Sequence, residues 1–136
     1  MEDKRKISIL IPYKIRDDKI SVYLQKRSKN AKRLPDYFGF FGGGIEHGEN
    51  PQEALVREIK EEMAFMPQGY EWLGEYEGER SIKYVFILGV DDDFEKKIEV
   101  LEGEYGKYFT EDEALHEPKL TEDDKRVLGD LYKKLK

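Results

Sequence analysis

Consecutive glycines followed by a helix rich in carboxylates give this sequence its clearest capacity for chemistry. The glycines and the acids are Gly42, Gly43, Gly44, Glu58, Glu61 and Glu62. Glycine allows positive φ and leaves room for a large ligand beside the main chain. We therefore expect Gly43 and Gly44 to contact an anionic group such as phosphate.

The helix that follows the glycines is predicted from local signals. Asn50 suits the N-cap, Pro51 the first helical position, and Glu53 stands three residues after the cap. Leu55 and Ile59 belong to an apolar stripe at helical spacing that also includes Val56 and Met63. These patterns predict a helix from residue 51 to about residue 63, with its stripe facing a core.

The three glutamates occupy an arc of roughly 100° beside that stripe. Glu58 and Glu62 repel each other at i,i+4, and only Arg57 is placed to pair with Glu61 along the helix. A hard divalent cation such as Mg²⁺, which prefers oxygen ligands and is often shared with substrate phosphates, would supply the missing charge. The alternative is a solvated acidic face, because glutamate is a good helix former.

The spacing of the segment resembles the Nudix box. The matching positions are Gly43, Glu49, Arg57, Glu58, Ile59, Glu61, Glu62 and Phe65. Ala64 is the one departure, because the family usually has glycine there. Alanine disfavours positive φ at a helix end, and we expect a small geometric adjustment.

The resemblance implies a metal site and a reaction. Similar proteins bind Mg²⁺ or Mn²⁺ through the acids that match Glu58, Glu61 and Glu62, helped by the carbonyl of the glycine that matches Gly42. They hydrolyse a diphosphate linkage in a nucleoside diphosphate joined to another group. The metal neutralises charge and activates water, and Glu58 or another acid of the site is the base.

Two further positions follow from the same resemblance. Glu49 and Arg57 match an ion pair that braces the loop against the helix, which gives Arg57 a supporting catalytic role. In MutT-like members an acid six residues before an aromatic-apolar pair contributes to the metal site, and Glu102 has that spacing to Tyr108. Glu104 competes for this role, and a surface acid is the alternative for both.

Outside the box, alternating patterns predict a hairpin over residues 6–25 and strands near 37–41, 70–76 and 80–90, with the last buried on both faces. Residues 91–93 are interpreted as a solvated turn, and caps at Thr110 and Thr121 predict helices near 110–116 and 121–136. Residues 26–33 form a cationic loop. Arg27 or Lys32 in this loop is a candidate phosphate contact, with a solvated connection as the alternative.

Composition limits the class of protein. A hydrophobic fraction of 38% in 136 residues predicts one domain over residues 1–136. The net charge of −6 argues against stable nucleic-acid binding. With no cysteine, no recognisable signal peptide and no apolar stretch long enough to cross a membrane, we expect a cytoplasmic protein without a membrane partner, as monomer or homodimer.

The predicted fold is α/β, a Nudix-type α/β/α sandwich with a central mixed β-sheet. The predicted function is Mg²⁺-dependent hydrolysis of a nucleoside triphosphate or another nucleoside diphosphate derivative. ADP-ribose, nucleotide sugars and dinucleoside polyphosphates are alternative substrates. A Nudix-fold module that binds a nucleotide without cleaving it is a different class of function that stays open.

Overall fold

The computed structural model describes residues 4–136, so the first three residues of the predicted domain lie outside the described part. The elements are β1 Arg5–Arg16, β2 Lys19–Lys26, β3 Phe38–Gly39, β4 Phe41–Gly44, α1 Pro51–Met63, β5 Glu71–Glu77, β6 Ser81–Gly89, α2 Phe94–Lys97, β7 Tyr105–Thr110, α3 Glu111–His116 and α4 Glu122–Leu135.

The long strand β1 organises the sheet. It runs parallel to β6 along most of its length and antiparallel to β4 and β2 in its first and second halves. β5 lies beyond β6, and β7 and β3 pair with β2. The sheet is therefore mixed, as predicted.

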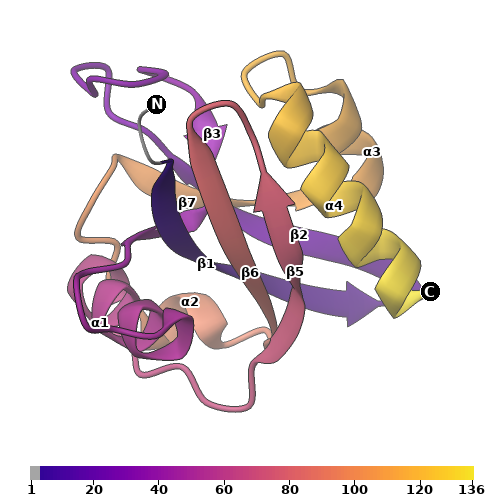
Figure 1. Cartoon of the computed structure of the whole chain (residues 1–136). Helices are drawn as coiled ribbons and strands as arrows, with labels where there is room; N and C mark the ends of the chain where they lie inside the picture. The colour runs from indigo at the N-terminus through magenta and orange to yellow at the C-terminus, as the bar shows by residue number, and fades with distance from the viewer. Residues whose placement is uncertain (1–3) are drawn as a thin grey trace.

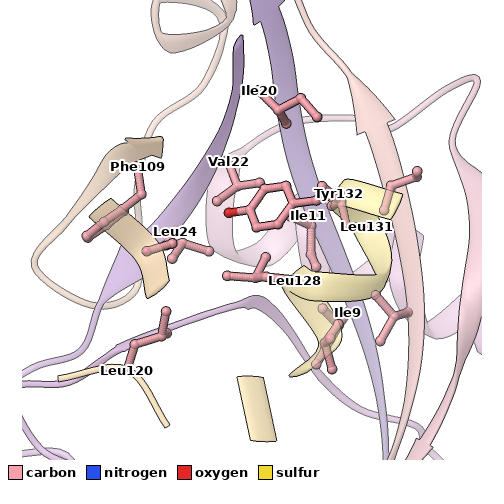
Figure 2. Packing of buried hydrophobic residues seen from close by; sticks show 14 of the residues in the cluster. Ile9, Ile11, Ile20, Val22, Leu24, Phe109, Leu120, Leu128, Leu131 and Tyr132 are labelled. Carbon is pink, nitrogen blue, oxygen red and sulfur yellow. The ribbon is translucent and has the colours of Figure 1, made fainter. Parts of the chain in front are cut away.

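Helices cover both faces of this sheet (Figure 1). On one face, Leu55, Ile59 and Met63 of α1 join a buried cluster with Phe41 and Phe86. The other face carries α3 and α4. Figure 2 shows α4 directing its apolar side chains onto β1 and β2, in a cluster that includes Leu128, Leu131, Tyr132, Ile9, Ile11, Val22 and Leu24. This arrangement confirms the predicted α/β/α sandwich.

Local sequence accounts for several elements. Asp17 and Asp18 both adopt positive φ, at 53° and 64°, and join β1 to β2 in a tight hairpin. In β6, Val85 belongs to the α4-side cluster and Phe86 to the α1-side cluster. The strand is thus buried on both faces, which explains its continuous apolar run.

Three features differ from the sequence prediction. The single strand expected near residues 37–41 is divided, because Phe38–Gly39 pairs with β2 whereas Phe41–Gly44 pairs with β1. The turn predicted at residues 91–93 is present, but the one-turn helix α2 that follows it, whose buried residue is Phe94, was not predicted. Strand β7 was not predicted, because its half-exposed residues are ordered by pairing with β2.

Residues 4–136 contain no helix with the length and apolarity needed to cross a membrane.

Candidate metal and phosphate site

The glycine strand β4 and the acidic helix α1 meet at very close range. The Gly42 N–H donates a hydrogen bond to Glu62 Oε2 at 2.9 Å. A Cβ at Gly43 would collide with the carboxylate of Glu58. The glycines were predicted to make room for a ligand, and the structure shows that Gly43 also makes room for a carboxylate of the site itself.

The start of α1 fixes where these carboxylates lie. Asn50 and Glu53 form a reciprocal capping box, with Pro51 in the first turn as predicted. The Ser8 hydroxyl donates to the carbonyl of Pro51 at 2.7 Å, which ties this helix end to β1. The helix therefore enters the site in one defined position.

Arg57 braces the loop between β4 and α1. Its Nε and Nη2 donate to the two carboxylate oxygens of Glu49 at 2.8 and 2.9 Å, and Nη2 also donates to the Gly44 carbonyl at 2.9 Å. These bonds, together with the Glu46 N–H, lower the pKa of Glu49 to about 2. The ion pair that the resemblance implied is present.

Glu62 is the most deeply buried acid of the site, with 3% of its surface exposed. Burial raises its pKa to about 8, the Gly42 hydrogen bond opposes this rise, and the neighbouring carboxyls of Glu102 and Glu58 add to it. Burial also raises the pKa of Glu58, against the opposing effect of Arg57. Several acids therefore share a region that disfavours their negative charge.

Glu102 is brought to this region by the chain before β7. The Leu101 N–H donates to the Glu62 carbonyl at 2.7 Å, and Gln25 Nε2 donates to the Glu102 carbonyl at 2.9 Å. Glu102 lines the same cleft as Glu58 and Glu62, whereas Glu104 does not line it. Of the two candidates weighed from the sequence, the structure brings Glu102 to the acids.

The carboxylates are available to a cation but are not gathered into a finished site. Glu58 and Glu61 accept from Arg57 Nη1 at 2.9 and 3.4 Å, while Glu62 faces the Gly42 N–H. Among residues 4–136, no three acidic, histidine or cysteine side chains converge tightly enough to hold a metal ion as they stand. The donor set is nevertheless all oxygen, with more negative charge than Arg57 can balance, which suits Mg²⁺ or Mn²⁺.

A cleft of about 1200 Å³ collects most of the residues predicted from the sequence. It is lined by Arg27, Lys32, Gly42, Gly43, Gly44, Glu58, Glu61, Glu62 and Glu102, among others. Arg57 is not among the lining residues and lies behind them as part of the brace. His47 and His116 are exposed and also lie outside the cleft.

The cleft is also lined by Arg5, Lys83 and Asp124, which were not predicted as site residues. Lys83 Nζ donates a hydrogen bond to Asp124 Oδ1 at 2.9 Å. Alternation with Ile7 could have placed Arg5 on one face of β1. The register of β1 against β4, which brings that face to the cleft, has no local signal.

The fold and the site together define a class of protein: an α/β/α sandwich in which a glycine strand is held against an acidic helix. The family model described as "NUDIX domain" matches residues 4–131. The chain therefore belongs to the NUDIX domain family, which confirms the family predicted from the box.

Known proteins agree with this assignment. The 8-oxo-dGTP diphosphatase of Escherichia coli K12 is 36% identical over 56 residues, which are 41% of this chain and 43% of that protein. The NUDIX domain of Shewanella oneidensis NrtR, solved with ADP ribose, has a TM-score of 0.77 at 16% identity and covers 100% of this chain and 91% of its own. A MutT NUDIX hydrolase from Burkholderia pseudomallei has a TM-score of 0.74 at 24% identity, with 96% and 99% covered.

Proposed function

We propose that this chain is a Mg²⁺-dependent hydrolase of the diphosphate linkage in a nucleoside triphosphate or another nucleoside diphosphate derivative. The observation that carries this proposal is the group of carboxylates that line the cleft beside the glycine strand, in which Glu62 is buried and Glu58 is half-buried. Such a group has a surplus of negative charge in a place that disfavours it, and a divalent cation relieves both problems.

The metal would be held by Glu58, Glu61 and Glu62, with the carbonyl of Gly42 and with Glu102 from the chain before β7. When bound, it would neutralise phosphate oxygens and increase the acidity of water. The Glu58 carboxylate is our candidate for the base that accepts the proton of the attacking water. Its contact with Arg57 Nη1 at 2.9 Å makes Arg57 the residue that positions it.

The substrate's phosphates would lie along the glycine strand, against Gly43 and Gly44, with Arg27 as a cationic partner. Nucleoside triphosphates, including oxidised ones, are the leading class, in line with the activity in the name of the Escherichia coli relative. ADP-ribose, which the similar Shewanella domain binds, is the main alternative, followed by nucleotide sugars and dinucleoside polyphosphates.

A module that binds a nucleotide without cleaving it is the second candidate. It is disfavoured because the acids of the box are all present, and Glu58, Glu61 and Glu62 line one cleft. Both candidates predict that Mg²⁺ with a product nucleotide raises the melting temperature by mass action. Only the enzyme predicts turnover.

The test is incubation with Mg²⁺ and a panel of triphosphates, nucleotide sugars, ADP-ribose and diadenosine polyphosphates, with chromatographic separation of the products. We expect one class to be cleaved, with the cleavage lost in Glu61→Gln. Thermal stabilisation by nucleotides without cleavage of any compound would favour the binding module instead.

A further inference from the structure

The cleft contains cations that form no ion pair with a carboxylate among residues 4–136, in a chain whose net charge is −6. Five lining residues form no ion pair with any carboxylate of residues 4–136: Arg5, Arg27, Lys32, Arg33 and Arg80. The other cations of the cleft are paired, for example Lys83 with Asp124 and Lys4 with Glu77. The cleft thus has a negative region at Glu58, Glu61 and Glu62, and it also contains the positive charges of these five unpaired side chains.

Arg5 is held directly beside the glycine strand. It shares one face of β1 with Ile7, and Ile7 is the register partner of Gly44. The Nη2 atom of Arg5 lies 3.3 Å from the position that a Cβ on Gly44 would occupy. A Cβ on the neighbouring residue Gly43 would instead meet the Glu58 carboxylate. Since successive residues of a strand point to opposite faces, Arg5 and Glu58 approach β4 from its two faces.

Arg27 lies near Gly39, at the other end of the chain segment that runs from Gly39 to Gly44. Its Nε donates to the Arg33 carbonyl at 2.9 Å, and its Cδ is 3.9 Å from a Cβ built on Gly39. A guanidinium anchored through Nε keeps donors for an anion without the full entropic cost of ordering a free side chain. The two arginines therefore flank the stretch of chain, Gly39 to Gly44, that carries the contacts with Glu62 and Glu58.

We propose that Arg5 is a specificity-determining residue that, opposite Arg27, binds a phosphoryl group beyond the diphosphate linkage that is cleaved. The preferred substrate then carries at least three phosphoryl groups, and a neutral sugar in place of the third is a poor substitute. Arginine suits this role because it binds phosphate through two parallel hydrogen bonds. This inference rests on the proposed function.

The reaction needs only water as co-reactant. The oxygen of water forms a bond to phosphorus, one bridging P–O bond breaks, and the bridging oxygen leaves with the other phosphoryl portion while the water proton passes to a base. Arg5 takes part in none of these bond changes. It is expected to act through substrate binding, and so on KM more than on kcat.

The kinetic test compares ATP with ADP-ribose, which share the adenosine diphosphate portion. We expect kcat/KM for ATP to exceed that for ADP-ribose by about tenfold or more, and Arg5→Gln to lower the ATP value by about tenfold, mainly through KM, with little effect on ADP-ribose. Arg16→Gln is the matched control, since Arg16 lies on the same strand, pairs with Asp92 and does not line the cleft. If Arg5→Gln lowered kcat/KM for ATP and for ADP-ribose by the same factor, the inference would be overturned.

A binding test separates this inference from the proposed function. Inorganic tripolyphosphate is titrated calorimetrically into the protein in EDTA, so that no turnover is required. We expect binding that weakens about tenfold in Arg5→Gln and in Arg27→Gln and is unchanged in Arg16→Gln. Tripolyphosphate binding without hydrolysis of any nucleotide would contradict the proposed function alone. Hydrolysis of ADP-ribose together with tripolyphosphate binding that is insensitive to Arg5 would contradict this inference alone.

Discussion

Glu62 combines a buried carboxyl group with a neutral hydrogen-bond donor, the Gly42 N–H. Glu62→Gln keeps an acceptor for that N–H and removes a carboxyl whose ionisation burial disfavours, so we expect an unchanged or higher melting temperature. Turnover should fall by about 100-fold or more, since a direct metal ligand should matter at least as much as its supporting residues. Steady-state kinetics and thermal unfolding measure the two effects.

Glu75→Gln is the control for this change, because Glu75 is an exposed acid of β5 that does not line the cleft. Full activity in Glu62→Gln, or equal losses in the two variants, would contradict the metal assignment.

Glu49 is expected to make the protein sensitive to acid. Its folded-state pKa of about 2 lies below the ordinary value of 4.5, so its contribution to stability is complete above about pH 4.5 and is lost as the pH falls toward 2. Glu49→Gln removes this contribution. Melting temperatures from pH 6 to pH 2 should therefore fall less steeply in the variant than in the wild type, and parallel curves would refute the expected role of the Arg57 pair.

Single residues were predictable where their spacing carried the signal. The pairing of Glu49 with Arg57 and the common cleft of Glu58, Glu61 and Glu62 were both anticipated from positions in the box. Arg5 was not, because its place beside Gly44 depends on how two strands distant in sequence are aligned.

At the level of elements, helix α1 ends in an unfavourable backbone conformation. Ala64 has φ 51° and ψ 41°, the left-handed region in which a Cβ is disfavoured, and its N–H donates to the Lys60 carbonyl. The helix end thus keeps the geometry for which the family uses glycine. Ala64→Gly should raise the free energy of unfolding by about 1 kcal/mol, measured by urea denaturation, with activity retained.

Ala54→Gly provides the contrast within the same helix. Ala54 is fully buried inside α1, where glycine should cost about 1 kcal/mol or more through backbone entropy and lost packing. If both variants were destabilised alike, the left-handed conformation at residue 64 would not carry the expected strain.

Elements with local signals were predicted with nearly correct bounds. The Asn50 cap immediately precedes α1, the first-turn proline and the apolar stripe lie within it, and the helix ends at Met63 as expected. The division of β3 from β4 and the existence of β7 depend on which partner strand each segment meets. The segments themselves carry no signal of that choice.

Across the whole molecule, α4 closes the domain over the sheet face opposite α1, and its Tyr132 hydroxyl is buried without a hydrogen-bond partner among residues 4–136. Tyr132→Phe removes this unsatisfied group, so stability should rise by about 1 kcal/mol. A loss of stability comparable to that of a cavity would show that the hydroxyl has a partner.

The buried hydroxyl of Tyr132 also leads us to expect a loss of stability at alkaline pH. Burial raises the pKa of Tyr132, so the folded protein favours the neutral phenol, and stability is retained below pH 10 and falls as the pH rises above it. Tyr132→Phe should lose less stability than the wild type between pH 9 and pH 11, as measured by chemical denaturation at each pH.

The layered architecture was predicted from the resemblance to the Nudix family, and the amphipathic helices and the doubly buried strand agree with it. The cleft could not be predicted in this way, because it is built jointly by the loop after β2, the glycine strand, the β5–β6 turn and the start of α4. Substrate preference depends on that assembly, and the box alone carries no information about it.

The decisive measurement for the metal site is turnover of the best substrate of the panel as a function of Mg²⁺ concentration, starting from EDTA-treated protein. The carboxylates at the glycine strand predict no turnover without a divalent cation and a saturable recovery when Mg²⁺ is added, with no recovery in Glu62→Gln. Turnover that persists in EDTA, or recovery that is equal in the variant, would contradict a metal site at these residues.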